Sequence, residues 1–132
     1  PLFYAFSFTI PKKGTSLKSF VISGAAETGE GSGQYGERTV RKGETTPDAM
    51  REKARQVLIT MEHRMSALGV GWRQVTSTQV YTIYDIHPFL EDEIVKRGAV
   101  NNGLVWHYAR PPVVGLDYEM DVRGVHRENF IF

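Results

Sequence analysis

Hydrophobic and polar positions follow two different periods along this chain, and the longer period marks one helix. Between residues 48 and 68 the apolar residues follow helical spacing, at Ala54, Val57, Leu58, Met61, Met65 and Leu68. This spacing places them on one face and predicts an amphipathic helix of about 30 Å. Thr46 supplies an N-cap, Pro47 suits the first helical position, and Gly69 ends the helix.

The shorter period, of two residues, predicts strands. Residues 116–126 alternate, with Leu116, Tyr118, Met120 and Val122 on one face and Asp117, Glu119, Asp121 and Arg123 on the other. The charged face either contacts water or lines a polar cleft. Other apolar runs predict strands over residues 2–10, 17–25, 72–84 and 104–110.

The remaining segments complete a fold of the α+β class. Residues 28–33 are a glycine-rich loop, an optional short strand covers residues 35–41, and a second helix covers residues 85–97. The order β-β-(β)-α-β-α-β-β predicts a mixed β-sheet with two helices packed on one face. We expect a single domain over residues 1–132.

Composition and charge narrow the class of protein. The 132 residues are 41% hydrophobic and 23% charged, as in soluble globular domains. The net charge of +1 and the scattered basic residues argue against a nucleic-acid partner. Since no apolar stretch approaches the roughly 18–20 residues of a membrane span, and no signal segment opens the chain, we expect a cytoplasmic protein without a membrane partner. A chain this small favours a site shared between subunits.

Several chemistries are absent from the sequence. The chain has no cysteine, which excludes disulfides, thiolate metal ligands and a cysteine nucleophile. Its four histidines lack the recurring spacing of a zinc site, so we expect no metal. The sequence also lacks a P-loop, a dinucleotide fingerprint and a nucleophile elbow.

Arg110 is the strongest candidate for a ligand-binding residue. It closes the apolar run of residues 106–110 and precedes two prolines. A guanidinium that ends such a strand requires an anionic partner, because an unpaired buried charge costs several kcal/mol. Its planar fork fits a carboxylate. That carboxylate belongs either to a bound ligand or to Glu119 or Asp121 of a neighbouring copy.

Four segments together resemble the RidA (YjgF) family of enamine and imine deaminases. Residues 20–24 are similar to an apolar family strand that ends in Ser-Gly, and residues 54–85 match the long helix and the strand after it without a gap. Residues 108–110 look like the family's Ala-Arg signature, and residues 118–122 take the place of its terminal acidic strand. The resemblance covers about residues 17–125.

The departures from the family pattern identify a divergent member. The family's amino-terminal Gly-Pro-Tyr-Ser segment, which supplies an aromatic hydroxyl, has no match before Leu17. The connection from Arg110 to Glu119 is shorter than in typical members, and the second helix lacks the expected asparagine. What replaces the hydroxyl is open, with Tyr4 among the aromatic candidates.

The resemblance implies a homotrimer with a ligand cleft at each subunit interface and no cofactor. By the same resemblance, Arg110 captures a substrate carboxylate and Glu119 orients water and moves protons, provided that burial raises its pKa. Ser23 and Gly24 contact the substrate, and Pro112 offers a main-chain carbonyl. Structural roles remain as alternatives to these site roles: Glu119 can be a solvated charge, and Ser23 and Gly24 can form a bend in the strand.

Three functions follow. The first is an enzyme that hydrolyses a small 2-imino or 2-enamino carboxylic acid, such as an aminomuconate-type intermediate of aromatic catabolism, to the 2-oxo acid and ammonia. The second is a non-catalytic module of the same fold that binds small carboxylates. The third is a tautomerase with Pro1 as its base, although that superfamily places a helix where this chain has a second predicted strand.

Overall fold

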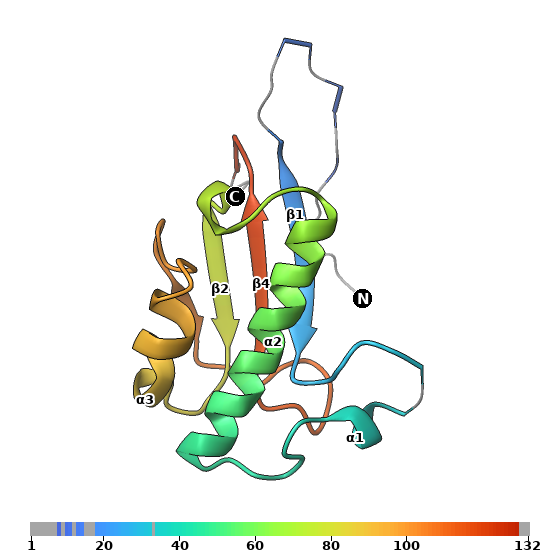
Figure 1. The fold of residues 1–132 in the computed structure, drawn as a ribbon, viewed down its shortest axis with the longest axis vertical. Coiled ribbons are helices and arrows are strands. Elements are labelled where there is room, and N and C mark those ends of the chain that lie inside the picture. The colour runs from blue at the N-terminus through green and yellow to red at the C-terminus, as the bar shows by residue number, and fades with distance from the viewer. Residues whose placement is uncertain (1–7, 9, 12, 15–17, 33, 130–132) are drawn as a thin grey trace.

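The computed structural model describes residues 8, 10–11, 13–14, 18–32 and 34–129 of the chain (Figure 1). The strand predicted over residues 2–10 falls almost entirely outside these residues, as does Pro1.

Within the described part of the chain, four strands form one mixed sheet. They are β1 (Phe20–Ala26), β2 (Ser77–Tyr81), β3 (Val105–His107) and β4 (Glu119–Gly124), in the order β1-β4-β2-β3. The inner strand β4 pairs antiparallel with both β1 and β2, whereas β2 and β3 are parallel. The mixed sheet with helices confirms the predicted α+β class.

The long helix α2 (Pro47–Ala67) agrees with the prediction to within a residue at each end. The Thr46 side chain accepts a hydrogen bond from the Ala49 N–H at 3.3 Å, as an N-cap does. Gly69 follows the helix with a φ of 66°, a conformation that favours glycine. Figure 1 shows α2 lying across one face of the sheet.

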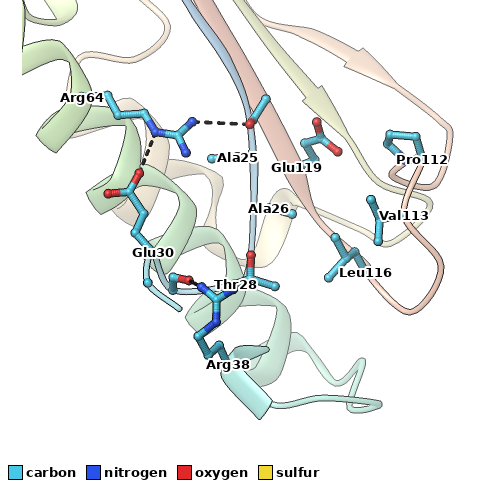
Figure 2. Close-up of a pocket in the computed structure, with 13 residues that line it drawn as sticks. Ala25, Ala26, Thr28, Glu30, Arg38, Arg64, Pro112, Val113, Leu116 and Glu119 are labelled. Carbon is cyan, nitrogen blue, oxygen red and sulfur yellow. Dashed lines mark hydrogen bonds and ion pairs between the residues drawn. The ribbon is translucent and has the colours of Figure 1, made fainter. Parts of the chain in front are cut away.

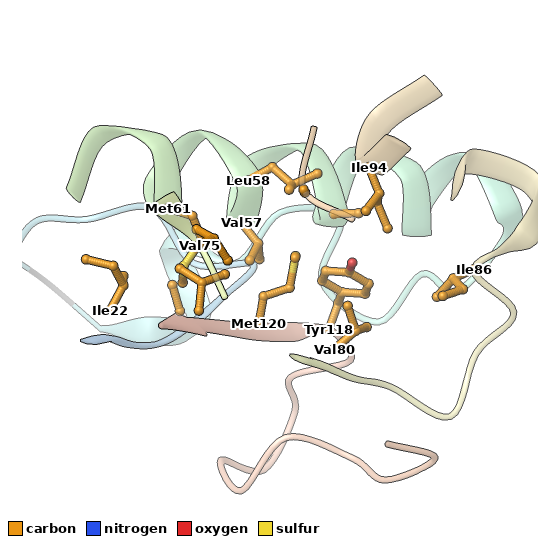
Figure 3. Packing of buried hydrophobic residues seen from close by; sticks show 14 of the residues in the cluster. Ile22, Val57, Leu58, Met61, Val75, Val80, Ile86, Ile94, Tyr118 and Met120 are labelled. Atoms are coloured by element: carbon orange, nitrogen blue, oxygen red, sulfur yellow. The ribbon is translucent and has the colours of Figure 1, made fainter. Parts of the chain in front are cut away.

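The core lies between α2 and the sheet (Figure 3). From the helix come Val57, Leu58 and Met61, which are fully buried. They face the apolar side of the sheet, where Val80, Tyr118 and Met120 are equally buried. The predicted apolar face of the last strand is therefore confirmed.

Several predicted elements are shorter than expected. The run of residues 72–84 divides into the 3₁₀ turn η1 (Trp72–Gln74) and the strand β2. The second helix is the short α3 (His87–Phe89) followed by the π-helical segment η2 (Leu90–Val95). Residues 35–41 are not a strand, because Tyr35–Arg38 forms the helical turn α1 and Thr39 alone pairs with Thr28.

The strand predicted over residues 104–110 ends early, at His107. This residue pairs with Tyr81, the last residue of β2, so the neighbouring strand offers no further partners. The chain then turns, and the Ala109 N–H donates to the His107 carbonyl at 2.8 Å. Arg110 therefore lies in the loop between β3 and β4, and its prediction as a strand-ending residue is wrong.

Asp117 also departs from the alternating pattern. Glu119, Asp121 and Arg123 lie half-exposed on the face of β4 opposite the core, as predicted. Asp117, expected on that face, is instead buried, because it precedes the first residue of β4 and pairs with Lys53 of α2. The sequence period loses its meaning where the strand pairing stops.

Candidate functional site

A cleft of about 370 Å³ opens along the end of β1 (Figure 2). Its lining comprises residues 24–26 and 28–31, Arg38, Arg64, residues 112–113 and 116 of the loop before β4, and Glu119. We call it the β1 cleft. It contains two carboxylates, those of Glu30 and Glu119, and two guanidinium groups.

Glu119 is the first residue of β4 and lies opposite Ala26 of β1. Its carboxylate makes no hydrogen bond or ion pair with any described residue, although the side chain is partly buried. Burial raises the pKa of Glu119, and the nearby carboxylates of Asp121 and Glu27 raise this pKa further. A carboxyl group with a raised pKa is better suited to accepting and returning a proton than an ordinary glutamate.

Gly24 provides the space that the Glu119 carboxylate occupies. The pairing of β1 with β4 is irregular between Ile22 and Ala25, so Gly24 lies in a bulge. A Cβ atom at Gly24 would overlap the Oε1 atom of Glu119. A side chain at this position would therefore displace the Glu119 carboxylate from its place beside β1.

Sequence reasoning missed Arg64, in the last turn of α2. Its Nε donates to Glu30 Oε1 at 2.8 Å, and its Nη1 lies 3.2 Å from the Ser23 carbonyl oxygen and 3.4 Å from that of Gly24. Figure 2 shows the guanidinium between Glu30 and β1. Helical spacing places Arg64 on the polar face of α2, and no sequence pattern separates it from other surface arginines.

Arg38, also missed, comes from the turn α1 and donates through Nη1 to the carbonyl of Gly29. The prediction that residues 35–41 form a strand concealed this position. The bond ties α1 to the loop after β1 and places a second cation beside the β1 cleft.

The structure gathers some of the predicted site residues and leaves others apart. Gly24, Pro112 and Glu119 all line the β1 cleft. Ser23 is absent from the lining, and its main-chain carbonyl accepts a hydrogen bond from Arg64. Arg110 is also absent from the lining of the cleft in its own chain.

Arg110 has its anionic partner within the chain. Its Nη1 lies 3.3 Å from Asp117 Oδ1, its Nη2 lies 3.2 Å from the Tyr84 hydroxyl, and the guanidinium carbon is 5.5 Å from the centre of the Tyr84 ring. The Arg110 side chain is nevertheless 56% exposed. The guanidinium is therefore held through both terminal nitrogens, while the side chain remains more than half exposed.

A buried ionic cluster of Glu27, Lys53 and Asp117 fixes the start of β4. Lys53 Nζ lies 2.5 Å from Asp117 Oδ2 and 3.5 Å from Glu27 Oε1, and the Lys53 and Glu27 side chains are fully buried. The Glu27 carboxylate also accepts the N–H groups of Asp117 at 2.6 Å and Tyr118 at 3.0 Å. Since Glu119 is the next residue, this cluster positions it at the cleft.

Two further properties concern the described residues only. They contain no helix that is both long enough and apolar enough to span a bilayer. They also contain no group of three or more His, Cys, Asp or Glu side chains arranged to hold a metal ion.

Residues 1–129 match the family model described as 2-aminomuconate deaminase CnbZ. Over 132 residues the chain is 43% identical to the 2-amino-5-chloromuconate deaminase of Comamonas testosteroni. The match covers 99% of this chain and 53% of that protein, so the chain spans about half the length of this relative.

Solved structures show a similar fold. The YjgF gene product of E. coli superposes with a TM-score of 0.54 and 18% identity, covering 81% of this chain and 80% of that one. The yeast protein YEO7 gives a TM-score of 0.50 and 20% identity, with 81% and 78% covered. These identities show the fold alone, and this fold is the one that the resemblance implied. The chain therefore has the fold of the YjgF structure and belongs to the 2-aminomuconate deaminase CnbZ family.

Proposed function

We propose that this chain catalyses hydrolytic deamination of a 2-imino or 2-enamino carboxylic acid of the aminomuconate type, within aromatic catabolism. The observation that carries this proposal is the Glu119 carboxylate, which lines the β1 cleft, has no hydrogen-bond or ion-pair partner among the described residues, and has a raised pKa. The family match and the name of the Comamonas testosteroni relative support this substrate class.

In this mechanism Glu119 moves one proton in each direction. An enamine substrate first takes a proton from solvent on carbon, and an imine substrate takes one on nitrogen, so both react as the iminium ion. As a water oxygen adds to the imine carbon, the Glu119 carboxylate accepts a proton from that water, which gives a carbinolamine. The Glu119 carboxylic acid then returns the proton to nitrogen, and the C–N bond breaks so that ammonia leaves. The carbinolamine hydroxyl releases its proton to solvent as the carbonyl of the 2-oxo acid forms.

The other predicted residues bind the substrate in this proposal. Arg110 captures the carboxylate next to the imine carbon through its fork of N–H donors. The main chain at Ser23 and Gly24 contacts the substrate, and the Pro112 carbonyl accepts a hydrogen bond from the imine or amine nitrogen. Pro112 suits an acceptor role alone, because proline has no N–H to donate.

Arg110 does not line the β1 cleft of its own chain, and we propose a homotrimer with clefts at the subunit interfaces, in which Arg110 reaches the cleft of a neighbour. Two observations support an assembly. The loop that carries Arg110 exposes Tyr108, Val113 and Val114, and the sheet face opposite α2 exposes apolar side chains at Val21 and Val105. Apolar patches of this kind mark protein interfaces. The exposed Arg110 guanidinium can then bind a substrate held against the neighbouring chain.

Ammonia release from 2-aminomuconate and 2-iminopropionate tests the proposed activity. We expect the chain to release ammonia, and we expect Glu119→Gln to lose this activity while it still binds a 2-oxo acid in a thermal-shift assay. Binding of 2-oxo acids without ammonia release by the wild-type chain would favour the non-catalytic module instead.

A further inference from the structure

Arg64 has the position of a second carboxylate receptor in the β1 cleft. Its Nη2 nitrogen donates no hydrogen bond to any described residue, whereas Nε and Nη1 are both bonded. The guanidinium is therefore held in place, and its Nη2 nitrogen can still donate hydrogen bonds to a ligand. It projects from α2, a helix of 21 residues packed on the sheet, so a ligand that binds it meets a rigid support.

Arg64 and Glu119 approach the same residue of β1. The Arg64 Nη1 atom lies 3.4 Å from the Gly24 carbonyl oxygen, while the Glu119 carboxylate fills the space where a Gly24 side chain would be. Figure 2 shows the two groups on opposite sides of β1, and both line the β1 cleft. A substrate whose imine carbon faces Glu119 can thus extend its far end to Arg64.

Glu30 is the carboxylate paired with Arg64 in the structure. Its carboxylate bonds Arg64 Nε at 2.8 Å and lies 3.6 Å from His63 Nδ1, and the Glu30 side chain is 47% exposed. An exposed ion pair of this kind contributes little to stability, so a competing carboxylate displaces it at low cost. His63, also on α2 and exposed, remains as a partner for the displaced Glu30.

Charge also favours a second anionic group on the ligand. The carboxylates of Glu30 and Glu119 balance the guanidinium groups of Arg38 and Arg64, and a monocarboxylate needs only the proposed contact to Arg110. A dicarboxylate brings one more negative charge, which needs one more cation. Arg64 can supply this cation, because its Nη2 nitrogen has no hydrogen-bond partner among the described residues.

We propose that Arg64 binds the carboxylate remote from the imine carbon and so makes the site selective for dicarboxylates, with Glu30 as the side chain that this carboxylate displaces. This inference rests on the proposed deaminase function, because it assigns the far end of the same substrate. It adds to that function the residue that distinguishes a muconate-type dicarboxylate from a short monocarboxylate.

The test compares kcat/KM for 2-aminomuconate with kcat/KM for 2-iminopropionate in each variant. We expect Arg64→Gln to lower the ratio of the two by about 10- to 100-fold, mainly through KM for the dicarboxylate. Arg64→Lys should recover part of the ratio, since it keeps the charge but loses the planar fork. Glu30→Gln should raise the ratio, because it removes the competing carboxylate.

Arg51 provides a matched control on the same helix. Like Arg64, it combines an exposed ion pair, to Asp92 at 3.6 Å, with a hydrogen bond to a main-chain carbonyl, that of Pro88 at 2.8 Å, but it lies outside the cleft. Arg51→Gln should keep the wild-type ratio.

Two outcomes would overturn the assignment of Arg64. In the first, Arg64→Gln and Glu30→Gln both lower kcat/KM for the two substrates by the same factor, which would limit the pair to holding the loop after β1. If the wild-type chain releases no ammonia, that result counts against the proposed function alone, and Arg64 is tested by calorimetric binding of hexanedioate and hexanoate instead. In that experiment the second overturning outcome is that Arg64→Gln weakens the binding of both acids equally.

Discussion

Asp117 and Glu119 are two residues apart at the start of β4, yet the chain gives their carboxylates opposite surroundings. Asp117 is buried and bonded to Lys53 on one side and to Arg110 on the other. Glu119 is half-buried, has two carboxylates nearby and has no cationic partner among the described residues. The contrast separates a carboxylate that stabilises the fold from one that is available for chemistry.

The largest expected effect comes from disrupting the buried ionic cluster that holds Asp117. Lys53→Met removes the positive charge that the buried carboxylates of Glu27 and Asp117 share. We expect the free energy of unfolding to fall by about 3–5 kcal/mol in urea denaturation. Lys96→Met, which removes an exposed lysine paired with Asp92 at 2.6 Å, is the control and should change stability little. A similar small change for Lys53→Met would show that the buried cluster is not essential.

Glu119→Gln removes the carboxylate that is proposed to act in catalysis, and it should lower activity while it raises stability. We expect ammonia release to fall by about 10²-fold or more, because glutamine cannot accept the proton from water. Because the folded-state pKa of Glu119 is raised, the folded chain loses stability as pH rises from the unfolded-state pKa through the folded-state pKa. The neutral glutamine avoids this loss.

The melting temperature of Glu119→Gln should therefore exceed that of the wild type at neutral pH, and the difference should vanish in acid below both pKa values. Thermal unfolding followed across this pH range measures it. A variant that is less stable than the wild type at neutral pH would mean that the Glu119 carboxylate has a stabilising partner.

Arg110→Ala should abolish turnover while the fold and the proposed trimer survive. The guanidinium is more than half exposed, so its ion pair with Asp117 contributes little to stability, about 0–1 kcal/mol. Ammonia release, thermal melting and the molar mass in solution measure the three properties. Unchanged ammonia release would remove Arg110 from the mechanism.

Gly24→Ala should have a smaller effect on activity. The added Cβ displaces the Glu119 carboxylate, which is the far end of a flexible side chain, so we expect activity to fall by about 10- to 100-fold with little loss of stability. Gly71→Ala is the control, since its φ of −157° suits alanine and its nearest neighbour is 4.0 Å away. If both variants keep full activity, the close approach of Gly24 to Glu119 is not needed for catalysis.

The elements that sequence predicted well carry their signals locally. Thr46, the spacing of apolar residues and Gly69 define α2 almost to the residue, and the alternation after Leu116 identifies the core face of β4. The resemblance likewise supplied three residues that the fold brings together at the β1 cleft, namely Gly24, Pro112 and Glu119.

The features that sequence did not reveal depend on contacts between distant segments. Asp117 is buried because Lys53 lies 64 positions away in the chain but adjacent in space. Arg64 contacts the cleft through carbonyls that a bulge in β1 exposes, and His107 ends its strand because β2 ends beside it. None of these partners can be read from a local pattern.

The pH dependence of kcat/KM for ammonia release from 2-aminomuconate tests the central role of Glu119 most directly. The carboxylate must be ionised to accept a proton from water, so activity should fall as pH decreases through the pKa of Glu119. Because that pKa is raised, we expect the acid limb of the wild-type profile to lie at a higher pH than for an ordinary glutamate. The residual activity of Glu119→Gln should show no such acid limb. An identical acid limb in both proteins would contradict this assignment.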